Sequence, residues 1–469
     1  MNADFNPNGG GTLTTKSGFD AYLAKYSGNG DFLWALSLGN TQGNTEERAW
    51  DIAVTESGDV YVSGGFHGSI DFNPLGTPNT VTLPNSNAGL FLAKYNKDGI
   101  NQWVVPIAAN DTSIFFEAYT AVDLDKSNNV IFAGNFRGSN VNFNPAGSAT
   151  LSSAGQTDIF FSSYTSNGAF NWAKRVGGTL QDIVSPGALR VDDSNSIFFT
   201  GRIAGTVDFD PGAGTNNVTG SSLFLASYNQ DGNQRFAFGM PSIPGDGGHR
   251  IGFDSDQNVY VSGWMNGTVN FNPSGSASLT ANSSTADVFL AKYTNIGQYL
   301  WAHHFGATNA TDQNISAGLS VDQQDNVYIT GQFSGTAADF DPGAGEILLS
   351  SSGGNDCFIA KFKSDGTVWR ATTGISDFET SITDFQLFQN YPNPFNPVTT
   401  IEFQTSRNEQ LTITLYDLQG RALEKIADGI YAAGIHKVVF KAENLSSGTY
   451  FYQLEAWDFK QTKKLIILK

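Results

Sequence analysis

One short phrase, Asx-Phe-Asx-Pro, recurs six times in the 469 residues and constrains the fold more than any other feature. Its prolines are 67, 71, 66, 62 and 69 residues apart. A period of this size is typical of propellers, solenoids and other repeat arrays. The six copies are Asp4–Pro7, Asp71–Pro74, Asn142–Pro145, Asp208–Pro211, Asn270–Pro273 and Asp339–Pro342.

Each phrase is followed by two segments that we predict to be strands. The first alternates apolar and polar residues, as Phe91–Tyr95 does, and the second carries an aromatic residue after a Gly turn. Alternation of this kind predicts a β-strand. The alternating segments are Tyr22–Tyr26, Phe91–Tyr95, Phe161–Tyr164, Phe224–Tyr228, Phe289–Tyr293 and Phe358–Phe362, and the aromatics are Trp34, Trp103, Trp172, Phe236, Trp301 and Trp369.

A hairpin precedes the phrase in every repeat but the first. Ile52–Val54 leads through the turn Thr55–Asp59 into Val60–Gly64, and apolar alternation around an Asp/Asn/Gly turn predicts a β-hairpin. Each unit then has four strands, and the Asx-Phe-Asx-Pro phrase lies between the second and the third. The same hairpin recurs at Val122–Gly134, Leu189–Gly201, Ile251–Gly263 and Leu319–Gly331.

A four-stranded unit cannot bury both of its faces alone, whereas units stacked around an axis bury them against each other. We therefore predict an all-β fold, with residues 1–370 forming a β-propeller of at least six four-stranded blades. The third strand would place Phe91, Ala93 and Tyr95 on one face and Leu92 and Lys94 on the other. The repeated aromatics are then interpreted as packing between blades.

The repeat count predicts that the first blade is incomplete at its N-terminus. The hairpin occurs five times, but the third and fourth strands occur six times. A closed six-bladed ring would be two strands short. We expect the native protein to start upstream, with the missing hairpin and a signal peptide there, because Met1–Asp4 has neither a basic nor an apolar region.

Charge and cysteine content exclude several classes of partner. The net charge is −18; residues 385–469 hold nine Lys/Arg and eight Asp/Glu, a net of +1, so the first 384 residues carry −19. An acidic surface repels nucleic acid and anionic membranes. No apolar run is long enough to span a membrane. The single cysteine, Cys357, forms no disulfide framework, and we expect it to be buried filler rather than a nucleophile.

The composition changes after Trp369. Residues 371–384 are predicted to be a linker, and the proline-rich segment Phe385–Pro397 is predicted to be extended. Alternating strands at short spacing then predict a small Ig-like β-sandwich over residues 385–469. The expected strands are Thr399–Phe403, Leu411–Tyr416, His436–Phe440, Thr449–Leu454 and Lys463–Leu468.

Two family resemblances cover most of the chain. The strands Asn258–Gly263 and Phe289–Tyr293 resemble the bacterial β-propeller repeat known as SBBP, and the likeness extends over residues 4–370. The C-terminal segment resembles the type A sorting domain of the type IX secretion system. The residues that carry this second resemblance lie in four ordered motifs and include Pro392, Asn393, Pro394, Asp417, Gly420, Arg421, Gly448, Tyr450, Lys463 and Lys464.

These resemblances imply where the protein acts but no particular reaction. The SBBP repeat implies an exported or surface protein. The sorting domain implies Sec export, recognition by the outer-membrane type IX translocon, and release or surface attachment, commonly with removal of the domain. It also implies Bacteroidota or a related lineage.

Few residues suggest chemistry. The neighbours His303 and His304 should point to opposite faces of a strand, and the sequence has no HExxH motif or phosphate-binding loop. The pairs Asp208 with Asp210 and Asp339 with Asp341 are weak Ca²⁺ candidates, because two carboxylates side by side suit that ion. Asx before Pro also favours a turn without any metal. The acidic pairs Asp123/Asp125, Asp192/Asp193 and Asp254/Asp256 lie in hairpin turns, where side-chain bonds to the backbone explain them.

The segment from Ala93 to Trp103 is also similar to the tryptophan-docking motif of quinoprotein propellers, in which the Trp locks blades together. We predict no cofactor. The irregular loops before each hairpin should gather on one face and bind an extracellular glycan or protein, and Trp50 and Phe115-Phe116 give that face aromatic character. A binding or scaffolding role is the leading hypothesis. An extracellular propeller hydrolase or lyase acting on a polymer is the alternative.

Overall fold

The computed structural model divides into two compact units, Met1–Ala371 and Thr372–Lys469. It describes the chain except residues 1, 7–8, 17, 41–45, 84–87, 109–118, 221, 243–246, 283–285, 307–313, 373–384, 406–407, 433, 443–444, 457–458 and 469. None of the residues it describes lies in a helix. The predicted linker 371–384 lies almost wholly outside the described residues.

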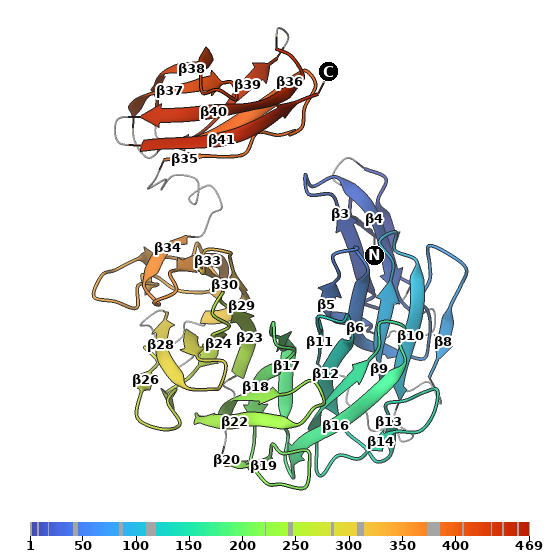
Figure 1. Ribbon diagram of the computed structural model, residues 1–469. Helices are drawn as coiled ribbons and strands as arrows, with labels where there is room; N and C mark the ends of the chain where they lie inside the picture. The colour runs from blue at the N-terminus through green and yellow to red at the C-terminus, as the bar shows by residue number, and fades with distance from the viewer. Residues whose placement is uncertain are drawn as a thin grey trace. The chain divides into compact units, whose positions relative to one another are not determined.

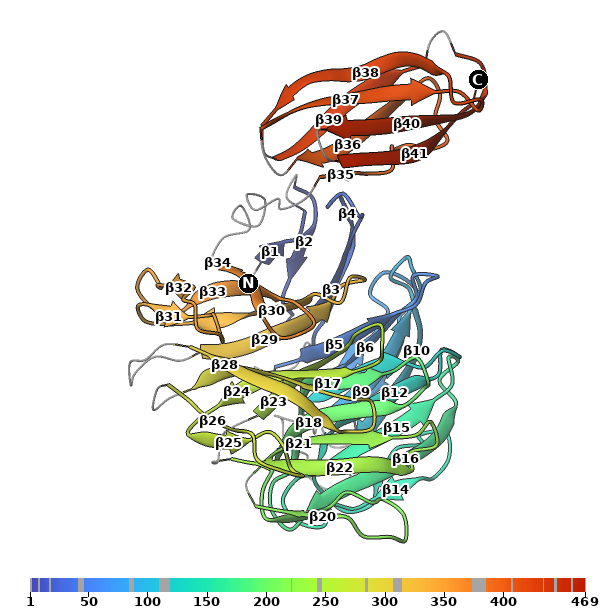
Figure 2. The same cartoon turned by 60° about the vertical axis from the view of Figure 1, so that its left-hand side comes forward.

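The first unit is a β-propeller (Figures 1 and 2). Four sheets of four antiparallel strands and one sheet of six follow the chain order from strand to strand, and a two-stranded sheet precedes them. In the six-stranded sheet, a short two-stranded hairpin of the next repeat is attached to a four-stranded unit. The first strands of successive sheets, β5, β11, β17, β23 and β29, contact one another in turn, so they line the axis of the propeller. The described residues thus hold five four-stranded units and one two-stranded unit in the order of the repeats, and the number of blades in the protein stays a prediction.

We name the sheets the half-blade and blades 2 to 6. The half-blade holds β3 (Ala21–Tyr26) and β4 (Phe32–Leu38). Blade 2 holds β5 (Arg48–Val54), β6 (Val60–His67), β9 (Ala88–Tyr95) and β10 (Asn101–Ala108), and blade 3 holds β11 (Thr120–Leu124), β12 (Val130–Phe136), β15 (Asp158–Tyr164) and β16 (Phe170–Gly178). Blade 4 holds β17 (Ile183–Val191), β18 (Ile197–Ile203), β21 (Ser222–Tyr228) and β22 (Gln234–Pro241). Blade 5 holds β23 (Gly247–Phe253), β24 (Val259–Met265), β27 (Asp287–Tyr293) and β28 (Tyr299–Phe305), and blade 6 holds β29 (Asn314–Val321), β30 (Val327–Phe333), β33 (Asp356–Phe362) and β34 (Val368–Thr372).

The Asx-Phe-Asx-Pro phrase lies between the second and third strands, as predicted, but it belongs to a short extra hairpin that the sequence did not predict. Strands of two or three residues carry too little alternation to be recognised. In two places the hairpin also pairs with the fourth strand of the preceding blade, at Gly177 with Asp208 and at Gly306 with Asp339. The hairpin strands are β1 (Asn2–Asp4) and β2 (Thr12–Thr14), β7 (Ser69–Asp71) and β8 (Thr80–Thr82), β13 (Val141–Asn142) and β14 (Thr150–Leu151), β19 (Thr206–Asp208) and β20 (Asn217–Thr219), β25 (Thr268–Asn270) and β26 (Ser278–Thr280), and β31 (Ala338–Asp339) and β32 (Leu348–Leu349).

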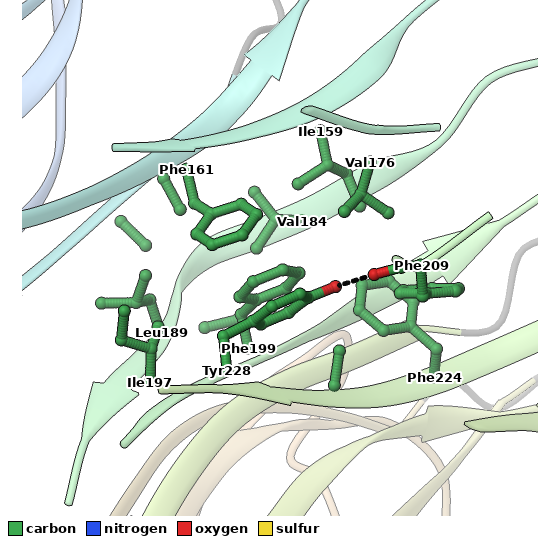
Figure 3. Packing of buried hydrophobic residues seen from close by; sticks show 14 of the residues in the cluster. Ile159, Phe161, Val176, Val184, Leu189, Ile197, Phe199, Phe209, Phe224 and Tyr228 are labelled. Atoms are coloured by element: carbon green, nitrogen blue, oxygen red, sulfur yellow. Dashed lines mark hydrogen bonds between the residues drawn. The ribbon is translucent and has the colours of Figure 1, made fainter. Parts of the chain in front are cut away.

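The core of the propeller lies between blades rather than inside them. Figure 3 shows the cluster between blades 3 and 4, where Phe161 of one blade packs against Phe199 and Tyr228 of the next. Phe199 and Tyr228 stack with their rings 8° from parallel. The Tyr228 hydroxyl donates to the carbonyl of Phe209, the buried Phe of the repeated phrase, at 2.8 Å. The repeated aromatics therefore pack between blades, as the sequence predicted.

A tryptophan on each of the first two fourth strands locks its blade to the next. Trp34 Nε1 donates to the carbonyl of Lys97, and Trp103 Nε1 donates to that of Ser166, both at 3.1 Å. The ring also covers the turn glycine of the following blade: a Cβ on Gly168 would lie 2.9 Å from Trp103. The docking role suggested for this Trp is confirmed at these two positions.

A second lock joins the turns between first and second strands. Asn195, Gln257 and Asp325 have positive φ, which usually favours glycine. Their side chains accept hydrogen bonds from backbone N–H groups in the preceding blade's turn, those of Lys126, Asp193 and Ser255 respectively. The side-chain acceptor explains why these positions are not glycine.

Cys357 is exposed, and the prediction that it is buried filler is wrong. The equivalent residues of blades 2 to 5 are buried because the following blade covers that face; Leu90 and Val288 are examples. In the described residues we find no cluster that joins this face of blade 6 to another blade. Cys357 therefore occupies a strand position whose side chain is buried by the following blade in blades 2 to 5 but is exposed in blade 6.

The second unit is a β-sandwich of two sheets around one core that includes Leu387, Ile413, Tyr452 and Leu465. The expected strands are present, and the sequence missed one long edge strand, β38. Its residues are mostly exposed, so they lack the apolar alternation of a half-buried strand. One sheet holds β35 (Gln386–Leu387), β36 (Val398–Thr405) and β39 (Gly434–Lys441), and the other holds β38 (Ala422–Tyr431), β37 (Glu409–Tyr416), β40 (Gly448–Ala456) and β41 (Phe459–Ile467).

Candidate functional site

A pocket of about 300 Å³ lies where the inner strands of blades 2 to 5 meet. Most of its walls come from the start of each of these blades, next to the irregular loops that the sequence singled out, and two lining residues come from the second strands of blades 4 and 5. Phe115-Phe116 lie outside the described residues. The lining residues are Trp50, Tyr119, Ile183, Ser185, Pro186, Arg202, Gly247, His249 and Trp264.

Two aromatic pairs form much of the lining. The rings of Trp50 and Tyr119 meet edge to face at 5.0 Å, and those of His249 and Trp264 meet at 4.0 Å. The guanidinium of Arg48 lies 5.4 Å from the Trp50 ring centre. Aromatic faces with a few polar groups are typical of pockets that bind small or polymeric ligands.

A bulge in β17 shapes the pocket near the propeller axis. Val184 pairs with Gly201 and Leu189 pairs with Phe199, so four residues of β17 stand opposite a single residue of β18. The bulge includes Gly187, whose φ of +65° suits glycine. It brings β17 into contact with β5, two blades away, and places the Pro186 carbonyl where Arg250 donates to it. The bulge thus supplies one wall of the pocket.

Charged side chains behind the pocket are tied to the backbone and to each other. Asp51 Oδ2 accepts the backbone N–H of Val122 at 3.0 Å and lies 3.9 Å from Arg190. Burial raises the pKa of Asp51, although Arg190 and Arg250 oppose that rise. This cluster fixes β5, β11 and β17 relative to one another.

His249 is held neutral. Burial lowers its pKa to about 3, and the positive charges of Arg250 and Arg202 contribute. At neutral pH the imidazole therefore offers hydrogen-bonding nitrogens but no charge, and Arg202 is the cation in the lining.

The Asx residues proposed as weak Ca²⁺ ligands make turn contacts. Asp208 Oδ1 accepts the backbone N–H groups of Asp210 and Asn216, and Asp339 Oδ1 accepts those of Asp341 and Ile347. The second carboxylate of each pair also accepts one backbone N–H, from Gly212 to Asp210 and from Gly343 to Asp341. Asn142 and Asn270 use Oδ1 in the same way, which explains why Asp and Asn alternate at this position.

Metal-ligand clusters are lacking in the part of the chain that the structure describes, where no group of three or more His, Cys, Asp or Glu side chains could hold an ion. The hairpin-turn acids behave as the sequence suggested: Asp125 Oδ1 accepts two backbone N–H groups, and Asp192 Oδ1 does the same. His304 contacts Asp287 at 3.0 Å while its neighbour His303 packs on Trp301. The two histidines thus have separate surroundings.

The sorting-domain motif residues stabilise local structure in the sandwich. Asp417 accepts the backbone N–H groups of Gln419 and Arg421 and the Arg421 Nε, and these bonds lower the pKa of Asp417. Gly420, with φ of +75°, completes this turn. Asn393 accepts the Ile466 N–H and donates to the Lys464 carbonyl, so it ties the entry segment to β41.

The remaining motif residues lie along the same strands. The Pro392 carbonyl accepts from Asn390 and Thr399, and the Tyr450 hydroxyl donates to the Ser446 carbonyl. Gly448 begins β40 and pairs with Ile467. Lys463 and Lys464 lie in β41 and pair with Tyr452 and Phe451 of β40. Pro394 lies in the entry segment just before Phe395, which is buried in the sandwich core.

Sequence reasoning found the loops but missed most of the pocket. Trp50 was recognised from its aromatic character. Arg202 and Trp264 lie on second strands, at the position that directly follows the repeated glycine. The other repeats have Gly65, Asn135 and Gln332 at this position, and the larger Arg and Trp side chains are the only signal in the sequence that could have indicated the site.

Comparison with known proteins assigns the second unit. Residues 389–468 match the family model described as "Secretion system C-terminal sorting domain". A curated relative, the "Uncharacterized WD repeat-containing protein L264" of Acanthamoeba polyphaga mimivirus, is 24% identical over 378 residues. That alignment covers 68% of this chain and 26% of the relative, so the chain spans about a quarter of the relative's length.

Two solved structures are similar over most of the chain. One is PorZ, described as an essential bacterial surface component of the type IX secretion system of Porphyromonas gingivalis, with 12% identity and a TM-score of 0.31 over 93% of this chain and 63% of that one. The other is a family 43 arabinoxylan arabinofuranohydrolase from Bacillus subtilis, with 10% identity and a TM-score of 0.29 over 89% of this chain and 95% of that one. Both TM-scores are too low to establish a shared fold.

The class of protein follows from the topology and the family match together. The chain is a β-propeller protein with a C-terminal sorting domain of the type IX secretion system. The sorting domain indicates a secreted or cell-surface protein that the type IX machinery handles. A search of the described residues finds no helix long and apolar enough to cross a membrane.

Proposed function

We propose that this protein is an exported binding module whose repeats are of the SBBP type. In this proposal a signal peptide directs Sec export and the outer-membrane translocon recognises the sorting domain. The propeller then presents its axial pocket to the extracellular medium. The family match at residues 389–468 supports the export route.

We propose that the ligand is a glycan, bound in the axial pocket. The observation that carries this proposal is the pairing of Trp50 with Tyr119 and of His249 with Trp264 around one cavity. Aromatic faces stack on the C–H faces of sugar rings, while a neutral imidazole and a guanidinium can bond to hydroxyl groups. The net charge of −19 over the first 384 residues favours a neutral glycan over an acidic one.

A glycan array probed with the full chain tests this proposal. We expect binding to neutral oligosaccharides, and a loss of about tenfold or more in affinity for Trp264→Ala and for Trp50→Ala, because each removes an aromatic face. Ile296→Ala changes an exposed apolar residue outside the pocket and is the matched control. Blank arrays, or equal affinities for all variants, would contradict the proposal.

A second candidate function is cleavage of a polymer by a lyase or hydrolase. It is favoured by one observation: the neutral His249, Tyr119 and Arg202 line the same pocket. A neutral imidazole or a tyrosine can exchange protons with a substrate, and a guanidinium can stabilise developing negative charge. Release of shorter products from a bound glycan, abolished by His249→Ala, would establish this function in place of simple binding.

A further inference from the structure

The half-blade leaves a groove along one edge of β3. The cavity measures about 690 Å³ and is bounded on one side by β3 and on the other by β5 of blade 2. In the described residues β3 pairs with β4 along its other edge, and no sheet continues beyond it on the groove side. An unpaired strand edge presents backbone N–H and C=O groups that can bond to another strand.

The five complete blades show what lies at this position. In each of them the third strand pairs on that side with the second strand of its own hairpin, as β9 pairs with β6. The register places a glycine opposite the first aromatic of the third strand, for example Gly64 opposite Phe91. A Cβ on Gly64 would lie 2.8 Å from the Phe91 ring, so the aromatic folds over the glycine.

The third strand of the half-blade carries the same residue types without that cover. Tyr22 is 59% exposed where Phe91 is 1% exposed, and Tyr26 is 41% exposed where Tyr95 is fully buried. The hydroxyl of Tyr26 nevertheless donates to the Phe5 carbonyl, as Tyr164 donates to that of Phe143. The strand therefore has its usual local structure, and only the cover on its edge differs.

The opposite wall of the groove shows that the missing cover is a hairpin and not only a neighbouring blade. Ile52 of β5 is 51% exposed, whereas its equivalents Val122 and Leu189 are fully buried. Val122 packs in one cluster with Ala53 and Tyr61, which belong to the first and second strands of the preceding blade. Among the described residues no such pair of strands covers Ile52, which is exposed for that reason.

We propose that this groove binds a β-hairpin with the repeat's own first- and second-strand pattern, supplied by a segment outside residues 1–469. The hairpin adds its second strand to the edge of β3, with a glycine opposite Tyr22, and lays its first strand over Ile52. Pairing of an added strand with an open sheet edge is a recognised mode of peptide binding. The new surface continues the apolar cluster that already joins the half-blade to blade 2.

A second copy of this chain is a poorer occupant. In the part of the chain that the structure describes, every first-and-second-strand hairpin is already paired within its own blade. A second copy could therefore supply a hairpin of this kind only by opening one of its own blades.

A fusion tests the proposal in the full chain. β6 ends at His67 and β7 begins at Ser69, and β1 occupies in the half-blade the place of β7. We therefore join a copy of residues 48–68 to Asn2, in place of Met1. We expect amide exchange in residues 21–26 and 48–54 to slow by about tenfold or more, because paired and buried N–H groups exchange only on opening. Fusion of a scrambled 21-residue segment is the first control.

Two substitutions within residues 1–469, outside the fused hairpin, make the test specific. Ile52→Asp places a charge on the proposed contact, and since Ile52 is exposed the unfused chain should still fold. We expect this variant to lose most of the protection given by the fused hairpin. Leu348→Asp, at an equally exposed residue of blade 6, should retain it.

Three results would overturn the proposal. They are equal protection by the scrambled segment, protection of β33 and β34 instead of β3, and protection of residues 21–26 in the unfused chain through self-association, measured by analytical ultracentrifugation. None of these measurements involves a glycan, so the proposal fails or holds independently of ligand binding in the axial pocket.

Discussion

The half-blade and the complete blades have nearly the same residues at equivalent positions, yet these residues differ in how much of their surface is buried. Tyr26 and Tyr228 end equivalent strands and both donate to the carbonyl of the phrase Phe, but Tyr26 is 41% exposed and Tyr228 is fully buried. The local hydrogen bond forms in both places. The difference teaches that the repeat specifies local structure by itself and that stability comes from the neighbouring strands and blades.

The largest difference between the two regions should come from the phrase Phe. Phe209→Ala removes a fully buried ring and should lower the free energy of unfolding by about 3–5 kcal/mol. Phe5→Ala removes a half-buried ring that contacts Tyr22 and should cost about 1–2 kcal/mol, in proportion to the smaller area lost. Denaturant unfolding followed by tryptophan fluorescence measures both, and equal losses would mean that the half-blade is as well covered as the others.

Two turn glycines allow the stabilising contribution of the tryptophan contact to be separated from backbone strain. Gly168 and Gly30 have nearly the same φ, +80° and +84°, so alanine should strain both backbones by about 1–2 kcal/mol. A Cβ at Gly168 would also press on Trp103, whereas at Gly30 nothing lies within 4 Å. Gly168→Ala should therefore cost roughly 1–3 kcal/mol more than Gly30→Ala. Thermal unfolding of the two variants checks this, and identical melting temperatures would show that the lock adds no stability.

Removal of a tyrosine hydroxyl should have a smaller effect. Tyr228→Phe leaves the buried Phe209 carbonyl without its donor and should cost about 1–3 kcal/mol. Tyr26→Phe exposes the Phe5 carbonyl to water, which can replace the donor, so its cost should stay below about 0.5 kcal/mol. Urea unfolding midpoints of both variants test this pair. A larger loss at Tyr26 would contradict the account of the half-blade given above.

Substitution of the first Asx of the phrase should change stability equally in the half-blade and in a complete blade. Asp208→Asn and Asp4→Asn both keep an Oδ1 that accepts two backbone N–H groups, so each should change stability by less than about 0.5 kcal/mol. The same variants examine the weak Ca²⁺ candidates. A rise in melting temperature on adding Ca²⁺, lost in Asp208→Asn, would establish a Ca²⁺ site that the turn contacts alone do not suggest.

Much of the fold could be predicted because the same spacing and alternation of residues occur in every repeat. Spacing and alternation placed the four strands of each complete blade and the position of the phrase. The short hairpins β7–β8 and their equivalents and the exposed strand β38 were missed, because two- or three-residue strands and solvent-facing edges carry no clear alternation. Cys357 was misjudged because its surroundings depend on a following blade that no local pattern describes.

The pocket could be predicted only in outline. Irregular loops before each hairpin pointed to one functional face, since variable segments on a regular scaffold usually carry binding. The bulge of β17, the Arg202 and Trp264 side chains on second strands, and the low pKa of His249 arise from contacts among four blades. Residues that far apart in the chain leave no common signal in the sequence.

The sequence by itself determined the all-β class, the blade with its named parts and the sorting domain, because each follows from short-range patterns that repeat or match a family. The tertiary structure alone decided which of the equivalent residues are buried and where the aromatic side chains converge. It also decided which strand edge is left open. Burial and convergence depend on what packs against a residue from distant parts of the chain, and Tyr26 and Tyr228 show how the same local structure acquires different surroundings.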